Sequence, residues 1–182
     1  MKFLIKELND TKKIANSLAK VLSGNDILTL QGDLGAGKTT FVRALAEGLG
    51  IDPDTVSSPT FTIMQIYESN SGPSLCHFDA YRLKGSESFL HEGFNEYFSD
   101  GMVVCIEWPE IIEDALEALD ADRLIIKITA ERAMALDFSA EKINVQIDNV
   151  HRDFEILANG KRAQEILDKW QELDSFPREL EV

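Results

Sequence analysis

The sequence predicts an α/β protein in which helices cover both sides of a mixed parallel and antiparallel sheet. The first observation is the stretch GDLGAGKT at residues 32–39, which fits the phosphate-binding pattern G-x-x-x-x-G-K-[ST]. The second is its context, because a strand-like apolar run at 26–31 precedes the loop and apolar residues at helical spacing follow it at 40–49. The third is the continuous apolar run at 102–106, typical of a strand buried on both faces. Together they predict the three-layer sandwich of the P-loop NTPases.

The glycine-rich loop at 32–39 has the features of an anion-binding loop. Its glycines let the backbone turn and approach phosphate oxygens without a Cβ in the way. A strand, a loop and a helix in that order present backbone N–H groups and a helix N-terminus to an anion. We expect Lys38 to reach the β- and γ-phosphates and the Thr39 hydroxyl to ligate Mg²⁺. The flanking elements favour a nucleoside triphosphate site over an ordinary glycine-rich turn.

The length and composition are those of one compact domain, alone or with a short appendage. The chain has 182 residues, of which 44% are hydrophobic and 27% charged. From about residue 149 strand signals become few, and an amphipathic stretch appears at 163–170. We therefore predict a P-loop ATPase domain at 1–150 and a mostly helical C-terminal extension at 151–182, packed on the same domain.

The charge and the cysteines limit the classes of partner and the compartment. A formal net charge of −14 disfavours direct binding to a nucleic-acid backbone, so a role in nucleic-acid chemistry would use a protein partner. Cys76 and Cys105 lie in apolar runs without metal-binding spacing, which indicates buried thiols in a reducing cytosol. The sequence shows no signal-peptide core and no run of membrane-spanning length. We expect a cytoplasmic protein without membrane contact, and a monomer.

The other elements follow from apolar periodicity and turn residues. Strands are expected at 3–8, 60–67, 75–81 and 123–130, with short antiparallel strands at 134–138 and 142–147. Helices are expected at 11–22, at 86–98 and after Pro109 to about residue 119. The turn cluster at 69–73 is short, which favours an antiparallel pair between the strands around it. The sheet should therefore be mixed.

Two acidic residues are candidates for chemistry beside the loop. Glu107 closes the apolar run at 102–106, which is the Walker B pattern, and its carboxylate could hold Mg²⁺. The alternative is an acid that caps the next helix near Pro109. Asp79 interrupts an apolar strand and could orient water or the metal near the γ-phosphate, although a solvent-facing acid is the simpler interpretation. His77 shares its strand face and is interpreted as structural. The predicted catalytic residues are Lys38, Asp79 and Glu107.

Further polar residues could contact the nucleotide. The stretch at 57–60 lies where P-loop switch proteins sense the γ-phosphate, so Thr60 could supply a hydroxyl or carbonyl there, or belong to a simple Ser-Pro turn. Arg82 and Arg132 are candidate phosphate or adenine-side contacts, or surface charges. Trp108 is interpreted as a core residue or as an aromatic that faces a partner.

Four ordered motifs resemble those of the TsaE family, also called YjeE. They are Gly-Asp-Leu-Gly-Ala-Gly-Lys-Thr-Thr-Phe at 32–41, Ser-Pro-Thr-Phe at 58–61, His-Phe-Asp-Ala-Tyr-Arg-Leu at 77–83 and Ile-Glu-Trp-Pro-Glu at 106–110. Glu131-Arg132 is similar to the family's late Gly-Glu-Arg element, although Ala130 stands where glycine is usual. The resemblance covers roughly residues 5–148. Typical members end near 150–160, so 151–182 is expected to be an extension.

This resemblance implies an ATPase of tRNA threonylcarbamoyladenosine synthesis, with ATP and Mg²⁺ as cofactors. Proteins of this family hydrolyse ATP slowly by themselves and work with TsaB and TsaD. TsaD transfers threonylcarbamoyl to an adenosine of tRNA, so the resemblance implies contact with tRNA only through the complex. ATP turnover would drive or reset that complex. By position, Thr39 and Glu107 would hold the metal, Asp79 would be needed for turnover and Thr11 would line the adenine pocket. The predicted nucleotide contacts are Thr11, Gly32, Asp33, Leu34, Gly35, Ala36, Gly37, Lys38, Thr39, Thr40, Thr60 and Arg132.

Two other functions fit a P-loop scaffold. A small-molecule kinase needs an Arg-rich lid, but residues 84–130 contain only Arg123 as an arginine. A GTP-dependent switch needs the guanine-specifying Asn-Lys-x-Asp, which the sequence lacks. The accessory ATPase is therefore the preferred hypothesis, and the kinase is the main alternative.

Overall fold

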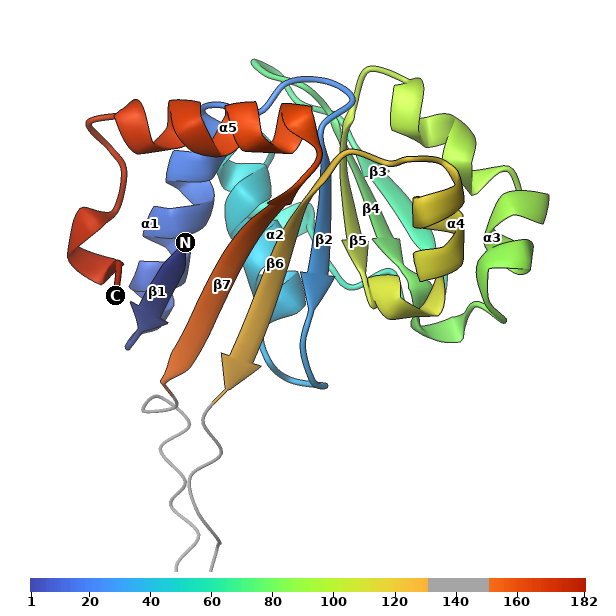
Figure 1. Ribbon diagram of the computed structural model, residues 1–182, viewed down its shortest axis with the longest axis horizontal. Coiled ribbons are helices and arrows are strands. Elements are labelled where there is room, and N and C mark those ends of the chain that lie inside the picture. The colour runs from blue at the N-terminus through green and yellow to red at the C-terminus, as the bar shows by residue number, and fades with distance from the viewer. Residues whose placement is uncertain (131–150) are drawn as a thin grey trace, which may run out of the picture.

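The computed structural model describes residues 1–130 and 151–182 and shows a three-layer α/β sandwich (Figure 1). The strands are β1 (Lys2–Ile5), β2 (Ile27–Gln31), β3 (Met64–Tyr67), β4 (Leu75–Asp79), β5 (Val103–Glu107), β6 (Arg123–Ala130) and β7 (Arg152–Asn159). The α-helices are α1 (Leu8–Ala19), α2 (Lys38–Gly48), α3 (Ser86–His91), α4 (Glu113–Ala118) and α5 (Lys161–Glu172). Short 3₁₀ helices include η2 (Ala80–Arg82), η3 (Phe94–Ser99), η4 (Pro109–Ile111) and η6 (Arg178–Leu180).

The described strands form one sheet in the order β1-β7-β6-β2-β5-β4-β3. The four central strands β6, β2, β5 and β4 run parallel, while β3 pairs antiparallel with β4 and β7 pairs antiparallel with both β6 and β1. The predicted mixed sheet is confirmed. Parallel strands end at the same edge, so the residues that follow β2, β4 and β5 lie together.

The buried residues of β5 show how the sheet is covered on both faces. Val103 and Cys105 belong to a core with α1 and α2, whereas Val104 and Ile106 belong to a second core with α3, η3 and α4. In Figure 1 the first pair of helices and the second group lie on opposite sides of the central strands. Alternation of buried side chains across two cores explains the unbroken apolar run. Both cysteines are buried, as expected.

Several predicted boundaries are wrong. The strand expected at 60–67 begins only at Met64, because residues 59–63 form a tight turn in which Ile63 has a φ of 67°. The helix expected at 86–98 is broken after α3 at Gly93, whose φ of 74° suits glycine, and η3 follows. The first strand ends at Ile5 and α1 begins at Leu8. The short strands expected at 134–138 and 142–147 lie outside the described residues.

The segment at 151–182 packs on the rest of the domain and contains a helix, but the prediction of a mostly helical extension missed the strand β7, with which it begins. Phe154 and Ile156 of β7 are buried in the core, while Glu155 between them is not. The strand lies between β1 and β6 in the sheet. Helix α5, which contains the predicted amphipathic stretch, runs across the top of the view in Figure 1, and its buried residues belong to the same core as those of α1 and α2. The segment is therefore part of the same folded unit as residues 1–130. No helix of the described residues is long and apolar enough to span a membrane.

Trp170 holds the two ends of the chain together. Its ring centroid lies 5.5 Å from that of Phe3 and 5.0 Å from that of Phe176, and its Nε1 donates to Ser17 Oγ at 2.9 Å.

We expect Trp170→Ala to lower the free energy of unfolding by about 3–5 kcal/mol, since it leaves a cavity in the core. Urea denaturation measures this. Trp170→Phe keeps a ring and should cost clearly less; an alanine variant as stable as the phenylalanine variant would contradict the role.

Candidate functional site

The loop between β2 and α2 depends on three glycines. Gly32, Gly35 and Gly37 have φ angles of 150°, 80° and 110°, a region that side-chain-bearing residues rarely adopt. A Cβ on Gly32 would also lie 2.5 Å from the Ile128 carbonyl oxygen of β6. The backbone can therefore take this path only without side chains. It leads directly into α2, and the first N–H groups of a helix have no partner within the helix, so they are available to an anion.

Lys38, the first residue of α2, reaches back across the loop. Its Nζ donates to the carbonyl oxygens of Gly32 at 2.6 Å and Asp33 at 3.0 Å, and lies 3.8 Å from the centroid of the Trp108 ring. Burial lowers the pKa of Lys38, while nearby carboxylates, first Glu107, act in the opposite direction. The ammonium group is thus held, largely desolvated, where an anion in the loop would be neutralised.

Thr39 lies beside the acid at the end of β5. Thr39 Oγ1 donates to Glu107 Oε1 at 2.8 Å, and His77 Nε2 of β4 lies 2.9 Å from the same oxygen. Glu107 makes no capping bond to the helix that follows, because η4 has no side-chain cap. The arrangement favours the Walker B interpretation of Glu107 over the helix-cap interpretation.

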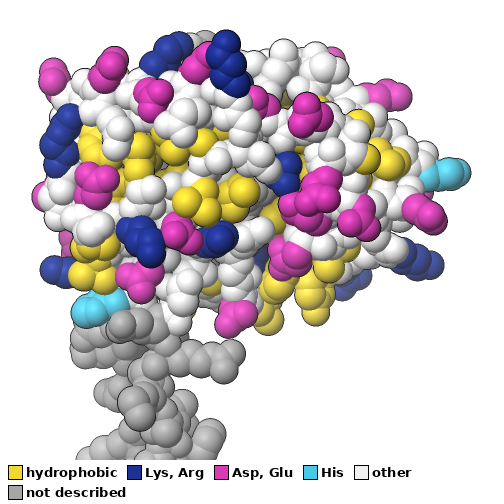
Figure 2. All heavy atoms as spheres, in the orientation of Figure 1, with side chains coloured by type: hydrophobic (Ala, Val, Ile, Leu, Met, Phe, Trp, Pro, Cys, Tyr) yellow, Lys and Arg dark blue, Asp and Glu magenta, His cyan; other side chains and the backbone are white. Residues whose placement is uncertain are grey.

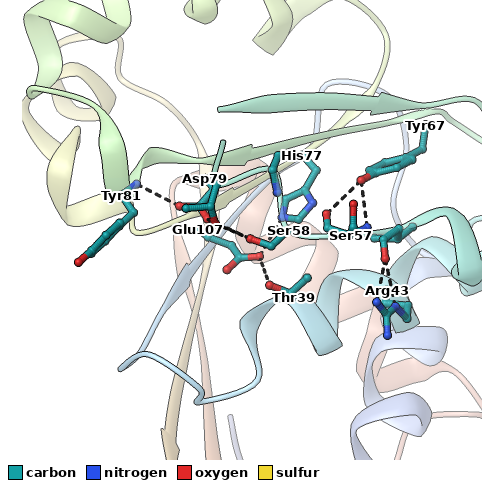
Figure 3. A network of polar contacts seen from close by, with 12 residues as sticks. Thr39, Arg43, Ser57, Ser58, Tyr67, His77, Asp79, Tyr81 and Glu107 are labelled. Carbon is teal, nitrogen blue, oxygen red and sulfur yellow. Dashed lines mark hydrogen bonds and ion pairs between the residues drawn. The ribbon is translucent and has the colours of Figure 1, made fainter. Parts of the chain in front are cut away.

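Asp79 at the end of β4 holds the segment that precedes β3 (Figure 3). It is only 2% exposed, so the solvent-facing interpretation is wrong. Its Oδ2 accepts hydrogen bonds from the hydroxyls of Thr60 and Ser58, and its Oδ1 accepts one from the Tyr81 backbone N–H. The carboxylate thus connects the end of a central strand to the predicted switch segment.

Two further contacts fix the start of this segment (Figure 3). Arg43 of α2 donates from Nε and from one terminal nitrogen to the Val56 carbonyl oxygen, at 3.2 and 2.9 Å. The Tyr67 hydroxyl donates to the Ser57 carbonyl oxygen at 3.1 Å and accepts from the Ser57 N–H at 3.3 Å. The segment is therefore anchored to the helix that follows the glycine loop and to β3.

The glycine loop, the start of α2, Glu107 and Asp79 surround a cavity of about 310 Å³ at the edge of the sheet. It is lined by Leu34, Gly35, Gly37, Lys38, Thr39, Thr40, Ser58, Thr60, Asp79, Tyr81, Glu107 and Trp108. A cavity of about 900 Å³ adjoins it and shares Gly37 and Thr40; its other lining residues are 6–11, Arg152, Phe154 and Leu180. The first cavity has the cation, hydroxyls and carboxylates that suit phosphates and a hard metal ion. The second gives room for the rest of a nucleotide.

The residues present fit a magnesium ion. Thr39 and Glu107 offer hard oxygen ligands, and Mg²⁺ is commonly held by one or two such groups together with water and substrate phosphates. Among the described residues no group of three or more His, Cys, Asp or Glu side chains could form a dedicated metal cage. A metal at this site would therefore be shared with a bound phosphate.

The structure brings most of the predicted site residues together. Loop residues 32–40, Thr60, Asp79 and Glu107 lie in or around the first cavity, and Thr11 lines the second. Their roles in binding stay predictions. Arg82 does not line either cavity and instead stacks on the Phe61 ring at 4.4 Å. Arg132 lies outside the described residues.

Sequence reasoning missed two residues of the site. Arg152 of β7 donates from Nε to the Ala36 carbonyl oxygen of the glycine loop at 2.9 Å. An arginine of the C-terminal segment therefore contacts the loop. No local signal reveals this, because it depends on where β7 pairs. His77, interpreted from the sequence as structural, is buried with its Nε2 2.9 Å from Glu107 Oε1, and this contact depends on the pairing of β4 with β5.

Comparison with known proteins gives consistent matches. A family model described as "Threonylcarbamoyl adenosine biosynthesis protein TsaE" matches residues 5–137. The tRNA threonylcarbamoyladenosine biosynthesis protein TsaE of Bacillus subtilis is 41% identical over 131 residues, covering 72% of this chain and 80% of that protein. The protein of that name from Aquifex aeolicus is 36% identical over 133 residues, covering 69% and 92%.

The fold has a solved relative. The crystal structure of Bacillus subtilis YdiB matches with a TM-score of 0.67 and 32% identity, over 94% of this chain and 93% of that one. A match of that extent includes most of residues 151–182. The expectation that this segment extends beyond typical relatives therefore does not hold for YdiB.

The position of Lys38 predicts a conflict between stability and binding. Because burial lowers its pKa below the ordinary 10.5, the unfolded chain holds the proton more tightly and the charge destabilises the folded state. We expect Lys38→Met to raise the melting temperature of the ligand-free protein by a few degrees, since about 1 kcal/mol corresponds to ~2–4 °C in a domain of this size.

The gain from Lys38→Met should shrink as the pH rises toward 10.5, where the wild-type lysine loses its proton in both states. Thermal unfolding between pH 7 and 10.5 measures it. Lys20→Met, at an exposed lysine of similar chemistry, is the control and should show little change. A lower melting temperature for Lys38→Met at pH 7 would contradict this account.

Proposed function

This chain belongs to the TsaE family of threonylcarbamoyl adenosine biosynthesis proteins, and we propose that it serves there as a Mg²⁺-dependent ATPase. One observation carries the proposal. The ends of three neighbouring parallel strands bring together Lys38 and Thr39 after β2, Glu107 on β5 and Asp79 on β4 around one cavity. This is the set of groups that P-loop ATPases use to bind and cleave the terminal phosphate.

Each residue has a distinct role in the proposal. Lys38 and the loop N–H groups neutralise the β- and γ-phosphate oxygens. Thr39 and Glu107 hold Mg²⁺, which offsets the charge that develops on the phosphates. Asp79, with the Thr60 hydroxyl already on its Oδ2, orients the attacking water. The second cavity, with Thr11 and Arg152, takes the nucleoside.

The proposed partners are TsaB- and TsaD-type proteins, with tRNA reached only through them, in the cytoplasm. The formal charge is −14, and acidic side chains gather over α4 in Figure 2, which disfavours direct tRNA binding. Leu34, which lines the cavity, is 89% exposed, and Phe61, the residue after Thr60 in the switch segment, is 83% exposed. Exposed apolar side chains of this kind suit contact with another protein.

The kinase alternative finds little support in the described residues. A kinase lid would present arginines to the transferred phosphate. Arg123 is the only arginine between 84 and 130, and it is buried at the opposite end of β6 from the glycine loop, bonded to Glu113. ATP hydrolysis therefore fits better than transfer to a small acceptor.

Calorimetric titration with ATP and with GTP in the presence of Mg²⁺ tests the function, followed by an assay for free phosphate. We expect ATP to bind more tightly than GTP, and phosphate to be released without an acceptor and faster when TsaB- and TsaD-type proteins are added. Absence of ATP binding would overturn the nucleotide site. A phosphorylated small acceptor in place of free phosphate would establish the kinase.

Asp79→Asn separates binding from turnover. The change keeps the size of the side chain but removes the carboxylate that would orient water, so we expect hydrolysis to fall about 100-fold or more. The affinity for Mg-ATP should stay within about threefold of wild type, a change below 1 kcal/mol. Asp114→Asn, at an exposed acid of α4, is the control. Wild-type turnover in Asp79→Asn would leave Asp79 only its role in holding the switch segment.

A further inference from the structure

His77 is a buried histidine in an apolar strand. Its side chain is 0% exposed, and its neighbours along β4, Cys76 and Phe78, are buried as well. The Nε2 atom lies 2.9 Å from Glu107 Oε1 on the adjacent strand β5. Because a carboxylate only accepts hydrogen bonds, Nε2 carries the hydrogen and donates it. His77 lines neither of the two cavities at the glycine loop, so any effect on a ligand must pass through Glu107.

An imidazole at this position has a cost that packing does not explain. The other ring nitrogen, Nδ1, is buried and has no hydrogen-bond partner among the described residues. Burying a polar atom without a partner destabilises the folded state, and an aliphatic side chain would fill the same space without that penalty. The histidine donates a hydrogen bond to Glu107, which an aliphatic side chain could not do.

That bond acts on one oxygen of the carboxylate. Glu107 Oε1 accepts from His77 Nε2 and from Thr39 Oγ1, at 2.9 and 2.8 Å. Within the part of the chain that the structure describes, Oε2 accepts no hydrogen bond, and Glu107 lines the cavity of the glycine loop. Two donors from different elements therefore fix the rotation of the carboxylate and leave Oε2 as the oxygen available to a cation or its water shell.

We propose that His77 is a positioning residue, which holds the Glu107 carboxylate in the orientation that binds Mg²⁺. The proposal rests on the proposed function, because it assumes a Mg-nucleotide in the cavity. Thr39 is itself an expected metal ligand, so its hydrogen bond to Glu107 must adapt when a cation binds. His77 lies behind the carboxylate and away from the cavity, and its bond can persist unchanged. Hydrogen-bond partners of metal-binding carboxylates commonly change metal affinity 10–100-fold when they are removed.

The test measures binding rather than turnover. A non-hydrolysable ATP analogue is titrated calorimetrically into the full chain, once with Mg²⁺ and once with EDTA, and the ratio of the two dissociation constants gives the Mg²⁺ enhancement. We expect His77→Leu to lower this enhancement about tenfold or more and to leave the affinity in EDTA unchanged. His77→Gln, whose amide nitrogen can reach the place of Nε2, should restore most of it. His77→Asn keeps the polarity but is too short to reach, so it should behave like the leucine variant.

Each outcome decides between the alternatives. If wild type binds the analogue with a Mg²⁺ enhancement and His77→Leu keeps it, the positioning role is wrong while the proposed function stands. Equal losses in the Gln and Asn variants would also overturn the role, because a reaching donor would then make no difference. Should His77→Leu fail to fold, the Gln and Asn pair gives the answer by the same ratio. A wild-type protein that does not bind the analogue would instead refute the proposed function.

Discussion

The structure depends on the register of three parallel strands, β2, β5 and β4. Leu30, one residue before the end of β2, pairs with Glu107 of β5, and Glu107 pairs with Asp79 of β4. This register places the glycine loop and two buried carboxylates at one edge of the sheet. A shift of one residue in either pairing would turn the acids to the other face and separate them from Lys38 and Thr39. The apolar residues of the two cores fix that register, because each side chain of β5 fits only one of the two faces.

A second consequence of this geometry is the link between the carboxylates and the switch segment. Asp79 holds Thr60 and Ser58 through its side chain, and its backbone N–H donates to the Ile63 carbonyl oxygen at 2.9 Å. Ile63 has a positive φ, which is rare for a β-branched residue and costs roughly 1–3 kcal/mol. The segment is thus held in a strained turn by the same acid that is proposed to orient water. Loss of the γ-phosphate on hydrolysis would therefore affect both Asp79 and the switch segment that Asp79 holds.

The sequence was sufficient where the signals are local. The glycines of the loop, the apolar run that closes on Glu107 and the spacing of α2 correctly predicted the strand, loop and helix at this edge of the sheet and the position of Glu107 beside them. Strand β7 was missed because the alternation of Asp153, Phe154, Glu155 and Ile156 is short and contains few β-branched residues, and because its partner β1 lies at the other end of the chain. Arg152 was missed for the same reason. The His77–Glu107 bond could not be predicted, since it depends on the β4–β5 pairing and not on the strand pattern alone.

The central claim is that the cavity between the glycine loop, Glu107 and Asp79 holds a metal–nucleoside triphosphate. A crystal structure with a non-hydrolysable ATP analogue and Mn²⁺ in place of Mg²⁺ tests it most directly, because the anomalous signal of manganese locates the ion. The account predicts a manganese peak in direct contact with Thr39 Oγ1, with Glu107 as a ligand or one water away, and the terminal phosphate between Lys38 and Asp79. A nucleotide bound elsewhere, or an ion that contacts neither Thr39 nor the shell of Glu107, would contradict it.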